Sequence, residues 1–305
     1  MKYKTLFVNT LFCCFSVTII FCQNPYLLIL GIAQDGGFPQ AGCAAECCTS
    51  FYSGKEKRKQ VSCLAIVDPK NKKTWMIDAT PDFPAQYKQV SQTSGFALNG
   101  ILLTHAHIGH YTGLMYLGRE VMNSQKMPVF TMPRMKYFLE TNGPWSQLIK
   151  LNNIELINMA NGEEIRLSDQ ISILPMLVPH RDEFSETVGF EIRSASKKVL
   201  FIPDIDKWNK WDKSIIDLIK SVDVALIDGT FYKNGEIKGR DMKEIPHPFI
   251  EETLNLLDSQ SIHEKNKVKF IHFNHTNPVL RNTKERKLLL KSGFNIATEG
   301  ERIGL

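Results

Sequence analysis

The sequence predicts an α/β fold, of the α+β kind, in which two β-sheets pack face to face and helices cover their outer faces. Two observations predict it. Short apolar runs typical of buried strands occur in both halves of the chain, with helical stretches between them. In addition, no internal repeat, linker or low-complexity segment divides the chain. The 305 residues, 43% of them hydrophobic, are therefore enough for one large domain with a substantial core.

The first half of the chain is rich in strands. Continuous apolar runs bounded by Gly, Pro, Asn or Asp indicate buried strands, and apolar residues three and four positions apart indicate helices. The paired glycines of Gln34-Asp35-Gly36-Gly37 indicate a tight loop that closes the first strand. In chain order we expect strands at residues 26–33, 61–68, 74–78 and 100–103, a helix at 111–121, a strand at 129–131, a helix at 134–150 and a strand at 154–158.

The second half has the same mixture of strands and helices. In chain order we expect strands at residues 171–178, 187–193 and 198–202, a helix at 214–220, a strand at 224–230, a helix at 249–258, a strand at 268–275 and a helix at 280–291. Two strand-rich halves with inserted helices suggest two sheets that share one core.

The N-terminus has the features of an export signal. Lys2 and Lys4 supply a positive n-region, and residues 6–21 form an apolar segment too short and too early for a stable membrane span. Cys22 is a small residue after which cleavage is plausible. The same cysteine is an alternative site for a lipid anchor, although bulky Phe21 before it makes a poor lipobox.

From this segment we expect residues 1–22 to be a signal peptide and residues 23–305 to be the mature domain. The mature protein would then be exported, either to the periplasm or out of the cell. It would be either soluble or lipid-anchored at Cys22.

The charge pattern excludes a nucleic-acid surface. The formal net charge is +5, and the charges are interspersed along the chain. The one basic run, residues 55–59, lacks the alternating aromatic residues that stack on bases, so we interpret it as a solvated loop. We therefore expect a small-molecule substrate and no nucleic-acid partner, and the sequence leaves the oligomeric state open.

Three histidines lie within six residues at a predicted strand-to-helix turn: His105, His107 and His110. His105 and His107 are two residues apart, so extended backbone points both imidazole rings to the same side. His110, where the helix begins, faces the same space from the other wall. Because neutral imidazole is the commonest ligand of borderline metals, this motif indicates a metal site rather than a polar turn.

Other polar residues also end the predicted buried strands. Together with the motif they are His105, His107, His110, His180, Asp204, Asp228, His272 and His275. Only His247 and His263, of the eight histidines, lie outside this set. Asp78 ends the strand before the histidine motif and is either a site residue or a turn cap, of which we favour the site. This distribution favours a shared metal site at one edge of the fold.

Four cysteines remain once the signal is removed: Cys43, Cys47, Cys48 and Cys63. An exported protein is able to pair them as disulfides. However, three of them lie within six residues, and adjacent cysteines bond each other only with strain. The clustered trio fits a structural zinc site better.

These residues resemble the pattern of the metallo-β-lactamase superfamily. The segments that carry the resemblance are Met76-Ile77-Asp78, Thr104-His105-Ala106-His107-Ile108-Gly109-His110, His180, Asp204 and a late histidine. Three more segments resemble its pyrroloquinoline-quinone (PQQ) biosynthesis protein B group: Asp35-Gly36-Gly37-Phe38-Pro39-Gln40, residues 223–230 and Asn274-His275-Thr276-Asn277-Pro278. The resemblance covers essentially the whole mature chain. It implies a four-layer αββα sandwich with metals at the edge between the two sheets.

The resemblance also implies roles for single residues. His105, His107 and His180 would bind a first metal, and His110, His272 and a bridging Asp204 a second. Asp78 would orient the histidine loop from behind. The metals would be Zn²⁺ at one or two positions, with Mn²⁺ or iron as alternatives at the second.

A similarity to cyclic phosphodiesterases of phosphonate metabolism implies a role for the remaining histidine of the set, His275. Those relatives hold a structural zinc with three N-terminal cysteines and a histidine three residues after the active-site one. The same spacing in His272-Phe273-Asn274-His275 implies a site of Cys43, Cys47, Cys48 and His275. The relatives have C-x-C-x-x-C where this chain has C-x-x-x-C-C, so either both adjacent cysteines bind the metal or one is spare.

Gly109 departs from the superfamily pattern H-x-H-x-D-H, in which the aspartate helps to bind the second metal and to orient water. Without it, either solvent fills a weakened second position, or one metal is bound tightly and the other loosely. In both cases we expect metal-activated water, with Asp204 orienting it and His180 or His247 protonating a leaving group.

The function implied by the resemblance is a metal-dependent hydrolase, with a phosphodiester favoured as substrate. The alternative is a metal-binding, non-hydrolytic protein that handles a ligand or a cofactor of quinone biosynthesis. Gly109 favours this alternative, and the retention of every other ligand favours the enzyme.

Overall fold

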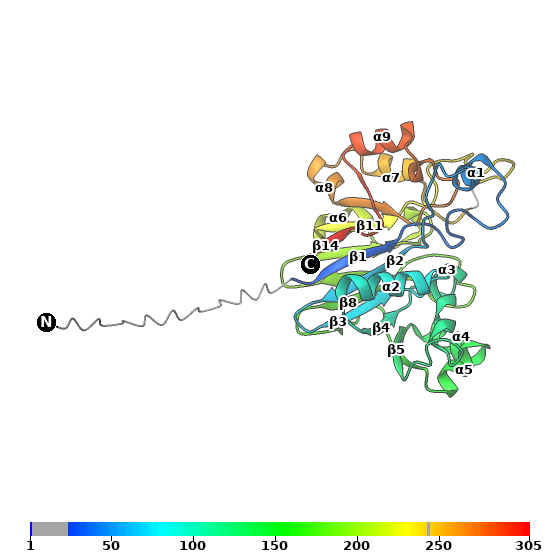
Figure 1. The fold of residues 1–305 in the computed structure, drawn as a ribbon. Coiled ribbons are helices and arrows are strands. Elements are labelled where there is room, and N and C mark those ends of the chain that lie inside the picture. The colour runs from blue at the N-terminus through cyan, green and yellow to red at the C-terminus, as the bar shows by residue number, and fades with distance from the viewer. Residues whose placement is uncertain (2–23, 243–244) are drawn as a thin grey trace.

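The computed structural model describes Met1 and residues 24–242 and 245–305 (Figure 1). The predicted signal peptide, residues 1–22 with Cys22, lies outside the described residues except for Met1. In the part of the chain that is described, no helix combines the length and the apolar character needed to cross a membrane.

One of the two sheets formed by the described residues contains the first strands of the chain and the last one. Its order is β14 (Arg302–Gly304), β1 (Tyr26–Gly31), β2 (Cys63–Asp68), β3 (Lys73–Ile77), β4 (Leu98–Leu102), β5 (Met127–Thr131) and β6 (Ile154–Asn158). The strands from β14 to β3 pair antiparallel, and those from β3 to β6 pair parallel.

The other sheet is built from the second half of the chain. Its order is β13 (Asn295–Ile296), β12 (Val268–Ile271), β11 (Val224–Asp228), β10 (Lys198–Ile202), β9 (Val188–Arg193), β8 (Ser172–Leu177) and β7 (Ile165–Arg166). The strands from β13 to β10 pair parallel, and those from β10 to β7 pair antiparallel. The same mixed pattern as in the first sheet therefore recurs.

Helices connect the strands. The α-helices are α1 (Glu46–Tyr52), α2 (Phe83–Ser94), α3 (Ile108–Tyr111), α4 (Pro133–Thr141), α5 (Trp145–Lys150), α6 (Ile215–Ser221), α7 (Ile250–Leu256), α8 (Ile262–Lys267) and α9 (Lys284–Lys291). Short 3-10 helices are η1 (Thr112–Leu117), η2 (Trp208–Lys210) and η3 (Pro278–Leu280). In Figure 1, α6 to α9 lie on one side of the paired sheets and α2 lies on the other.

Strand β1 shows why the sheets stack. Successive side chains of a strand point to opposite faces. Leu27 and Ile29 of β1 belong to the core that also contains Phe190 of the other sheet. Leu28 between them belongs to a second core, with Phe83 of α2. A strand buried on both faces reads as a continuous apolar run, and burying both faces requires helices outside the sheets. The predicted αββα sandwich is confirmed.

Several predicted helices differ from those of the structure. The predicted helix 134–150 is divided into α4 and α5, because Pro144 cannot donate a helical hydrogen bond. The predicted helix 280–291 begins later, since Thr283 caps α9 by accepting a hydrogen bond from a backbone N–H of its first turn. The predicted helix 111–121 is the short α3 followed by η1.

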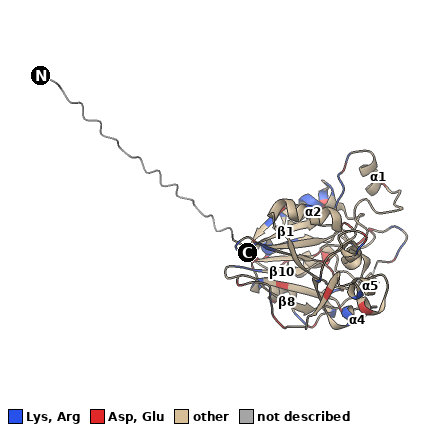
Figure 2. Cartoon of the chain, turned by 60° about the horizontal axis from the view of Figure 1, so that its bottom comes forward, with Lys and Arg blue, Asp and Glu red and all other residues tan. Residues whose placement is uncertain are grey.

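Charged residues are distributed as the sequence indicates. In the view of Figure 2, both basic and acidic positions are spread over the described part of the chain, with basic positions on α2 and both kinds on α4.

Candidate metal centre

The carboxyl ends of strands from both sheets meet at one edge of the sandwich. The polar residues there are, in chain order, Asp35 after β1, Asp78 after β3, His105, His107 and His110 after β4, His180 after β8, Asp204 after β10, Asp228 at the end of β11 and His272 after β12. Such an edge is where α/β proteins place their functional groups. All of these side chains except that of Asp78 belong to groups whose possible ligand atoms lie within 4.8 Å of one another.

The first group consists of His105, His107, His180 and Asp204. Nδ1 of His107 lies 2.9 Å from Nε2 of His105 and 3.3 Å from Nε2 of His180. Oδ2 of Asp204 lies 3.3 Å from Nε2 of His105. Ligand atoms about 2.0 Å from a tetrahedral zinc are about 3.3 Å apart, so this geometry fits one metal ion.

The protonation states of this group also fit. Burial lowers the pKa of His180 to about 4 and lowers the pKa of His105 well below its usual value. Burial raises the pKa of Asp204, but the neighbouring His180 and His247 outweigh it and hold that pKa well below its usual value. At neutral pH His105 and His180 are therefore neutral imidazoles and Asp204 is a carboxylate, which are the forms that bind metal.

The second group consists of His110, His272 and Asp35. Oδ1 of Asp35 lies 3.1 Å from Nε2 of His110 and 3.7 Å from Nε2 of His272. These three atoms are buried, and none has a hydrogen-bond partner among the described residues. Buried polar atoms are almost always paired, and a divalent cation would satisfy all three. Oδ2 of Asp204 lies 4.0 Å from Nε2 of His272 and so stands between the two groups.

Opposite charges dominate the second group. Burial raises the pKa of Asp35, but the imidazoles of His110 and His272 outweigh it and hold that pKa well below its usual value. Burial lowers the pKa of His110, but Asp78 and Asp35 raise it well above its usual value. Binding a metal at this position therefore displaces a proton from His110.

Asp78 holds the histidine loop. Its Oδ2 lies 2.7 Å from Nδ1 of His110, and its Oδ1 accepts a hydrogen bond from the backbone N–H of Thr104, with a donor–acceptor distance of 2.8 Å. Its backbone φ of 71° is in the left-handed region, as is that of His272 at 66°. Such backbone costs about 1–3 kcal/mol for residues other than glycine, and it persists where the surrounding structure imposes it.

His247 and Asp228 form a pair beside the first group. Nδ1 of His247 lies 2.9 Å from Oδ2 of Asp228 and 3.2 Å from Oδ1 of Asp204. Burial lowers the pKa of His247, but Asp228 and Asp204 raise it to about 9. His247 is therefore cationic at neutral pH and lies next to a predicted metal ligand.

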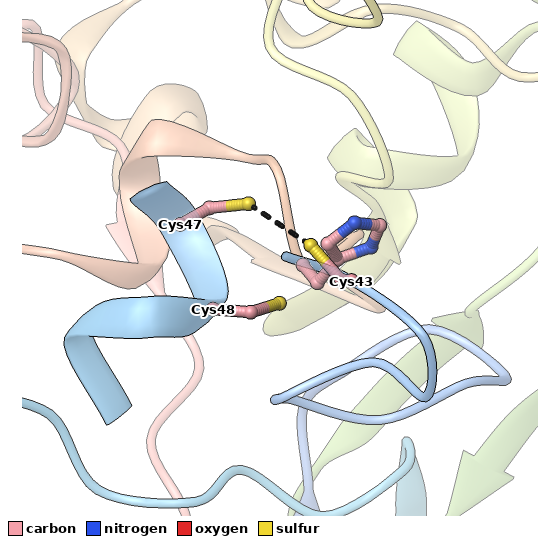
Figure 3. A group of neighbouring side chains, drawn as sticks. Cys43, Cys47 and Cys48 are labelled. Atoms are coloured by element: carbon pink, nitrogen blue, oxygen red, sulfur yellow. Dashed lines mark hydrogen bonds between the residues drawn. The ribbon is translucent and has the colours of Figure 1, made fainter. Parts of the chain in front are cut away.

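The cysteine cluster lies around the start of α1 and the segment that follows β12. Cys43, Cys47, Cys48 and His275 form a group of possible ligand atoms (Figure 3). Sγ of Cys43 lies 3.7 Å from Sγ of Cys47, close to the roughly 3.8 Å between two sulfurs of a tetrahedral zinc site. Figure 3 shows the side chains of Cys47 and Cys48 directed toward Cys43. Both adjacent cysteines thus reach the group.

Protonation of the thiols differs within the cluster. Burial raises the pKa of Cys48 to about 12. Burial raises the pKa of Cys43 too, but hydrogen bonds from Cys48 and from the backbone of Ala45 lower it overall. A bound zinc would deprotonate a coordinating thiol outright, so the residues present fit that ion.

The structure brings together all the residues predicted for each site. The two active-site groups contain His105, His107, His110, His180, Asp204 and His272, and the cysteine group contains Cys43, Cys47, Cys48 and His275. Their binding of metal stays a prediction. Sequence reasoning missed Asp35 and the catalytic potential of Asp228. Asp35 follows a buried strand, as the other site residues do, but the two glycines after it also indicate a turn, so its position alone did not mark it as a site residue. His247 lies in a loop between two prolines, where only its type attracts notice.

A cleft of about 340 Å³ lies beside the metal centre. Its lining includes Gln34, Asn274 and His247 from the neighbourhood of the centre, together with Arg181 and Arg240. Among the described residues that line it, the charged side chains are all basic. The cleft therefore favours an anionic ligand.

Residues 74–302 match the family described as the beta-lactamase superfamily domain. The chain belongs to this superfamily. The matched segment includes the histidine motif, Asp204 and His272. The expected family is thus confirmed, on a match that spans most of the chain.

Curated relatives show which group within the superfamily the chain resembles. The chain is 28% identical over 297 residues to coenzyme PQQ synthesis protein B of Acinetobacter baylyi, covering 86% of this chain and 94% of the relative. It is 25% identical over 312 residues to the protein of that name from Klebsiella pneumoniae, covering 92% and 98%. The expected similarity to this group is confirmed.

Solved structures agree on the fold. Zn²⁺-bound PqqB from Methylobacterium extorquens superposes with a TM-score of 0.76 at 21% identity, covering 92% of this chain and 100% of that one. A diphosphatase from the PhnP family superposes with a TM-score of 0.65 at 18% identity, covering 93% and 98%. At these identities the likeness concerns the fold alone.

Proposed function

We propose that this protein is a metal-dependent hydrolase that uses metal-activated water on a phosphodiester. The observation that carries the proposal is the pair of ligand groups on either side of Asp204. Oδ2 of this carboxylate lies 3.3 Å from His105 in the first group and 4.0 Å from His272 in the second. Two adjacent metal positions with a shared carboxylate suit in-line displacement at phosphorus.

Divalent cations held in these groups would lower the pKa of water to about 7 and polarise the phosphoryl oxygens. The cofactor that we propose is Zn²⁺ at one or both positions, with Mn²⁺ or iron as alternatives at the second. Side chains of the protein orient the water and the metal ligands. Asp204 accepts a hydrogen bond from the attacking water and orients it, and Asp78 fixes the ring of His110 through a bond of 2.7 Å.

His247 is suited to protonate the leaving group. It carries a proton at neutral pH, and Asp228 holds its Nδ1 at 2.9 Å, which fixes the orientation of the ring. It also lines the basic cleft, so a substrate that lies there meets it. His180 was the other candidate for this step. Burial lowers its pKa to about 4, so it carries no proton at neutral pH and suits metal binding instead.

The phosphodiester is favoured by two further observations. The basic cleft with Arg181 and Arg240 suits an anionic substrate. One structure of the same fold is that of a diphosphatase, which acts on phosphorus–oxygen bonds. The proposed substrate is therefore a small anionic ester of phosphoric acid.

A second candidate function has its own observation. The curated relatives are coenzyme PQQ synthesis proteins, matched over most of both chains. On this alternative, the protein binds metal without hydrolysing an ester, and it handles a ligand or cofactor of quinone biosynthesis.

One experiment separates the two functions. Metal content of the mature chain is measured by mass spectrometry, and phosphodiesters, phosphomonoesters, thioesters and lactams are then assayed with and without chelator. We expect phosphodiester hydrolysis that the chelator abolishes. His180→Gln should abolish it as well, whereas His263→Gln, at a histidine whose side chain is 78% exposed, should not. Activity that resists chelator, or no activity with two metals bound, would contradict the hydrolase and leave the second candidate.

We also propose that the chain is exported, on the evidence of its first 22 residues. Expression in a bacterial host followed by cell fractionation and N-terminal sequencing tests this. A protein that keeps its N-terminus and stays in the cytoplasm contradicts it, and a lipid on Cys22 identifies the anchored form.

A further inference from the structure

Gly109 is in close contact with Asp35. A Cβ atom added to Gly109 would lie 2.3 Å from Oδ1, 2.6 Å from Cα and 2.9 Å from Cγ of Asp35. Packed atoms do not approach one another so closely, and two of these contacts are to the carboxyl group itself. The carboxylate of Asp35 therefore fills the space that a side chain at position 109 would need.

The backbone of both sheets fixes Asp35 in this place. Beyond the end of β1 the chain continues as an extended segment, and Ala33 forms a parallel bridge with Phe273. The N–H of Gln34 donates to the carbonyl of Phe273 at 2.8 Å, and the N–H of Phe273 donates to the carbonyl of Ile32 at 2.8 Å. Phe273 follows His272 directly. Asp35 follows Gln34 directly. These two backbone hydrogen bonds therefore hold it beside His272, a predicted metal ligand.

The carboxylate points at the two histidines rather than at solvent. Oδ1 of Asp35 lies 3.1 Å from Nε2 of His110 and 3.7 Å from Nε2 of His272. All three atoms are buried and lack a hydrogen-bond partner among the described residues. Three buried atoms that converge on one point, joined only by the ion-pair contact between Asp35 and His110, are the donor set of a cation site.

We infer that Asp35 is the carboxylate ligand of the second metal position, in the place that the superfamily pattern gives to an aspartate at position 109. The second position then has His110, His272, Asp35 and the shared Asp204, four ligands like the first. Gly109 does not signal a lost ligand. It is the residue that makes room for a ligand supplied by another loop.

This inference deepens the proposed function, because it concerns the same metal centre, but its test needs no substrate. The variants are Asp35→Asn and, as a control, Asp206→Asn, which alters another partly buried carboxylate two residues from Asp204. Zinc content and zinc affinity are measured by mass spectrometry and by competition with a chromophoric chelator. Circular dichroism shows that each variant is folded.

We expect Asp35→Asn to weaken one zinc and leave the others bound. Residues that merely orient a ligand change affinity by about 10–100-fold, so loss of a ligand should exceed about 100-fold for that one zinc. Asp206→Asn should keep wild-type affinities. If Asp35→Asn is folded and binds every zinc as the wild type does, Asp35 is not a ligand and the inference is wrong.

An exchange of the residues at positions 35 and 109 tests directly whether the two side chains would occupy the same space. Asp35→Gly should weaken the same zinc, and Gly109→Asp alone should lower thermal stability because the two side chains overlap. Asp35→Gly combined with Gly109→Asp should regain at least about tenfold of the lost affinity, within the range that ligand geometry controls. If the double variant is folded and binds zinc no better than Asp35→Gly, the two positions do not share one place. Failure of hydrolysis with zinc binding as expected would contradict the proposed function and not this inference.

Discussion

The carboxylate of Asp78 joins the two walls of the metal centre: its Oδ2 lies 2.7 Å from Nδ1 of His110, and its Oδ1 accepts from the backbone N–H of Thr104 at 2.8 Å. The first contact fixes the ring of His110, so that Nε2 faces Asp35. The second fixes the residue before His105. Asp78 thereby positions one histidine of each ligand group.

Asp78→Asn should therefore weaken metal binding at the second group more than at the first. An amide placed with its NH₂ toward Nδ1 of His110 favours the wrong tautomer of the ring, and loss of such an outer contact costs about 10–100-fold in metal affinity. Zinc affinities measured by chelator competition check this. Asp68→Asn is a matched control, since Asp68 is a fully buried carboxylate at the end of β2 with no place in the metal-ligand groups among the described residues. Equal affinities in both variants would contradict the positioning role.

Cys43→Ser should remove one zinc and leave the active-site metal in place. Serine cannot replace a thiolate at a tetrahedral site, and binding energy at such a site is folding energy. The loop around α1 should become more sensitive to proteolysis, as limited trypsin digestion would show. Cys63→Ser is the control, because Cys63 is buried in β2 outside the cluster. Unchanged zinc content in Cys43→Ser would refute the structural site.

The metal-free protein should lose stability as the pH rises from about 6.5 to 9. His247 has its pKa raised to about 9 in the fold, so between these values the folded state holds a proton that the unfolded state has released. Its stabilisation is complete below pH 6.5 and declines by about 1.4 kcal/mol for each pH unit across this window. Urea unfolding at a series of pH values measures the slope. His110, whose pKa is also raised, contributes to the same slope, so His247→Asn should make the slope smaller and His263→Asn should not change it. An unchanged slope in the first variant would count against the assignment.

Arg240→Gln should raise the KM for an anionic phosphodiester and leave its kcat nearly unchanged. A hydrogen bond to a charged group contributes about 1.5–3 kcal/mol, so we expect an increase of about tenfold or more. Lys238→Gln is the matched control, because Lys238 is a cation of the same loop that lines a different cleft, beside Cys47. The difference in KM between Arg240→Gln and the wild type should shrink at high salt, since exposed charges are screened. If both variants behave alike, the basic cleft does not bind the substrate.

Most of the strands were predictable because they are buried on both faces. A run such as Leu27 to Leu30 is apolar at every position, and such runs cannot be stable in solvent. The ends of helices were less predictable. Their boundaries depend on single local contacts, such as the cap at Thr283 and the break at Pro144, which compete with helical spacing.

The residues of the candidate metal centre were predictable as residue types at strand ends, and the structure groups His105, His107, His180 and Asp204 as predicted. Asp35 was not found, because the family pattern directs attention to position 109 and a lone Asp before two glycines is typical of a turn. Only the contact between Asp35 and Gly109 relates the two positions.

The sequence by itself determined the class of fold and the superfamily and predicted the ligand chemistry of the centre, because burial periodicity and histidine spacing are local properties of the chain. The tertiary structure decided which carboxylate stands at the second metal position. That choice depends on the extension of β1 that pairs with the segment after β12, a contact between residues 240 positions apart. No local pattern encodes such a pairing, since it arises only when the two sheets close on each other.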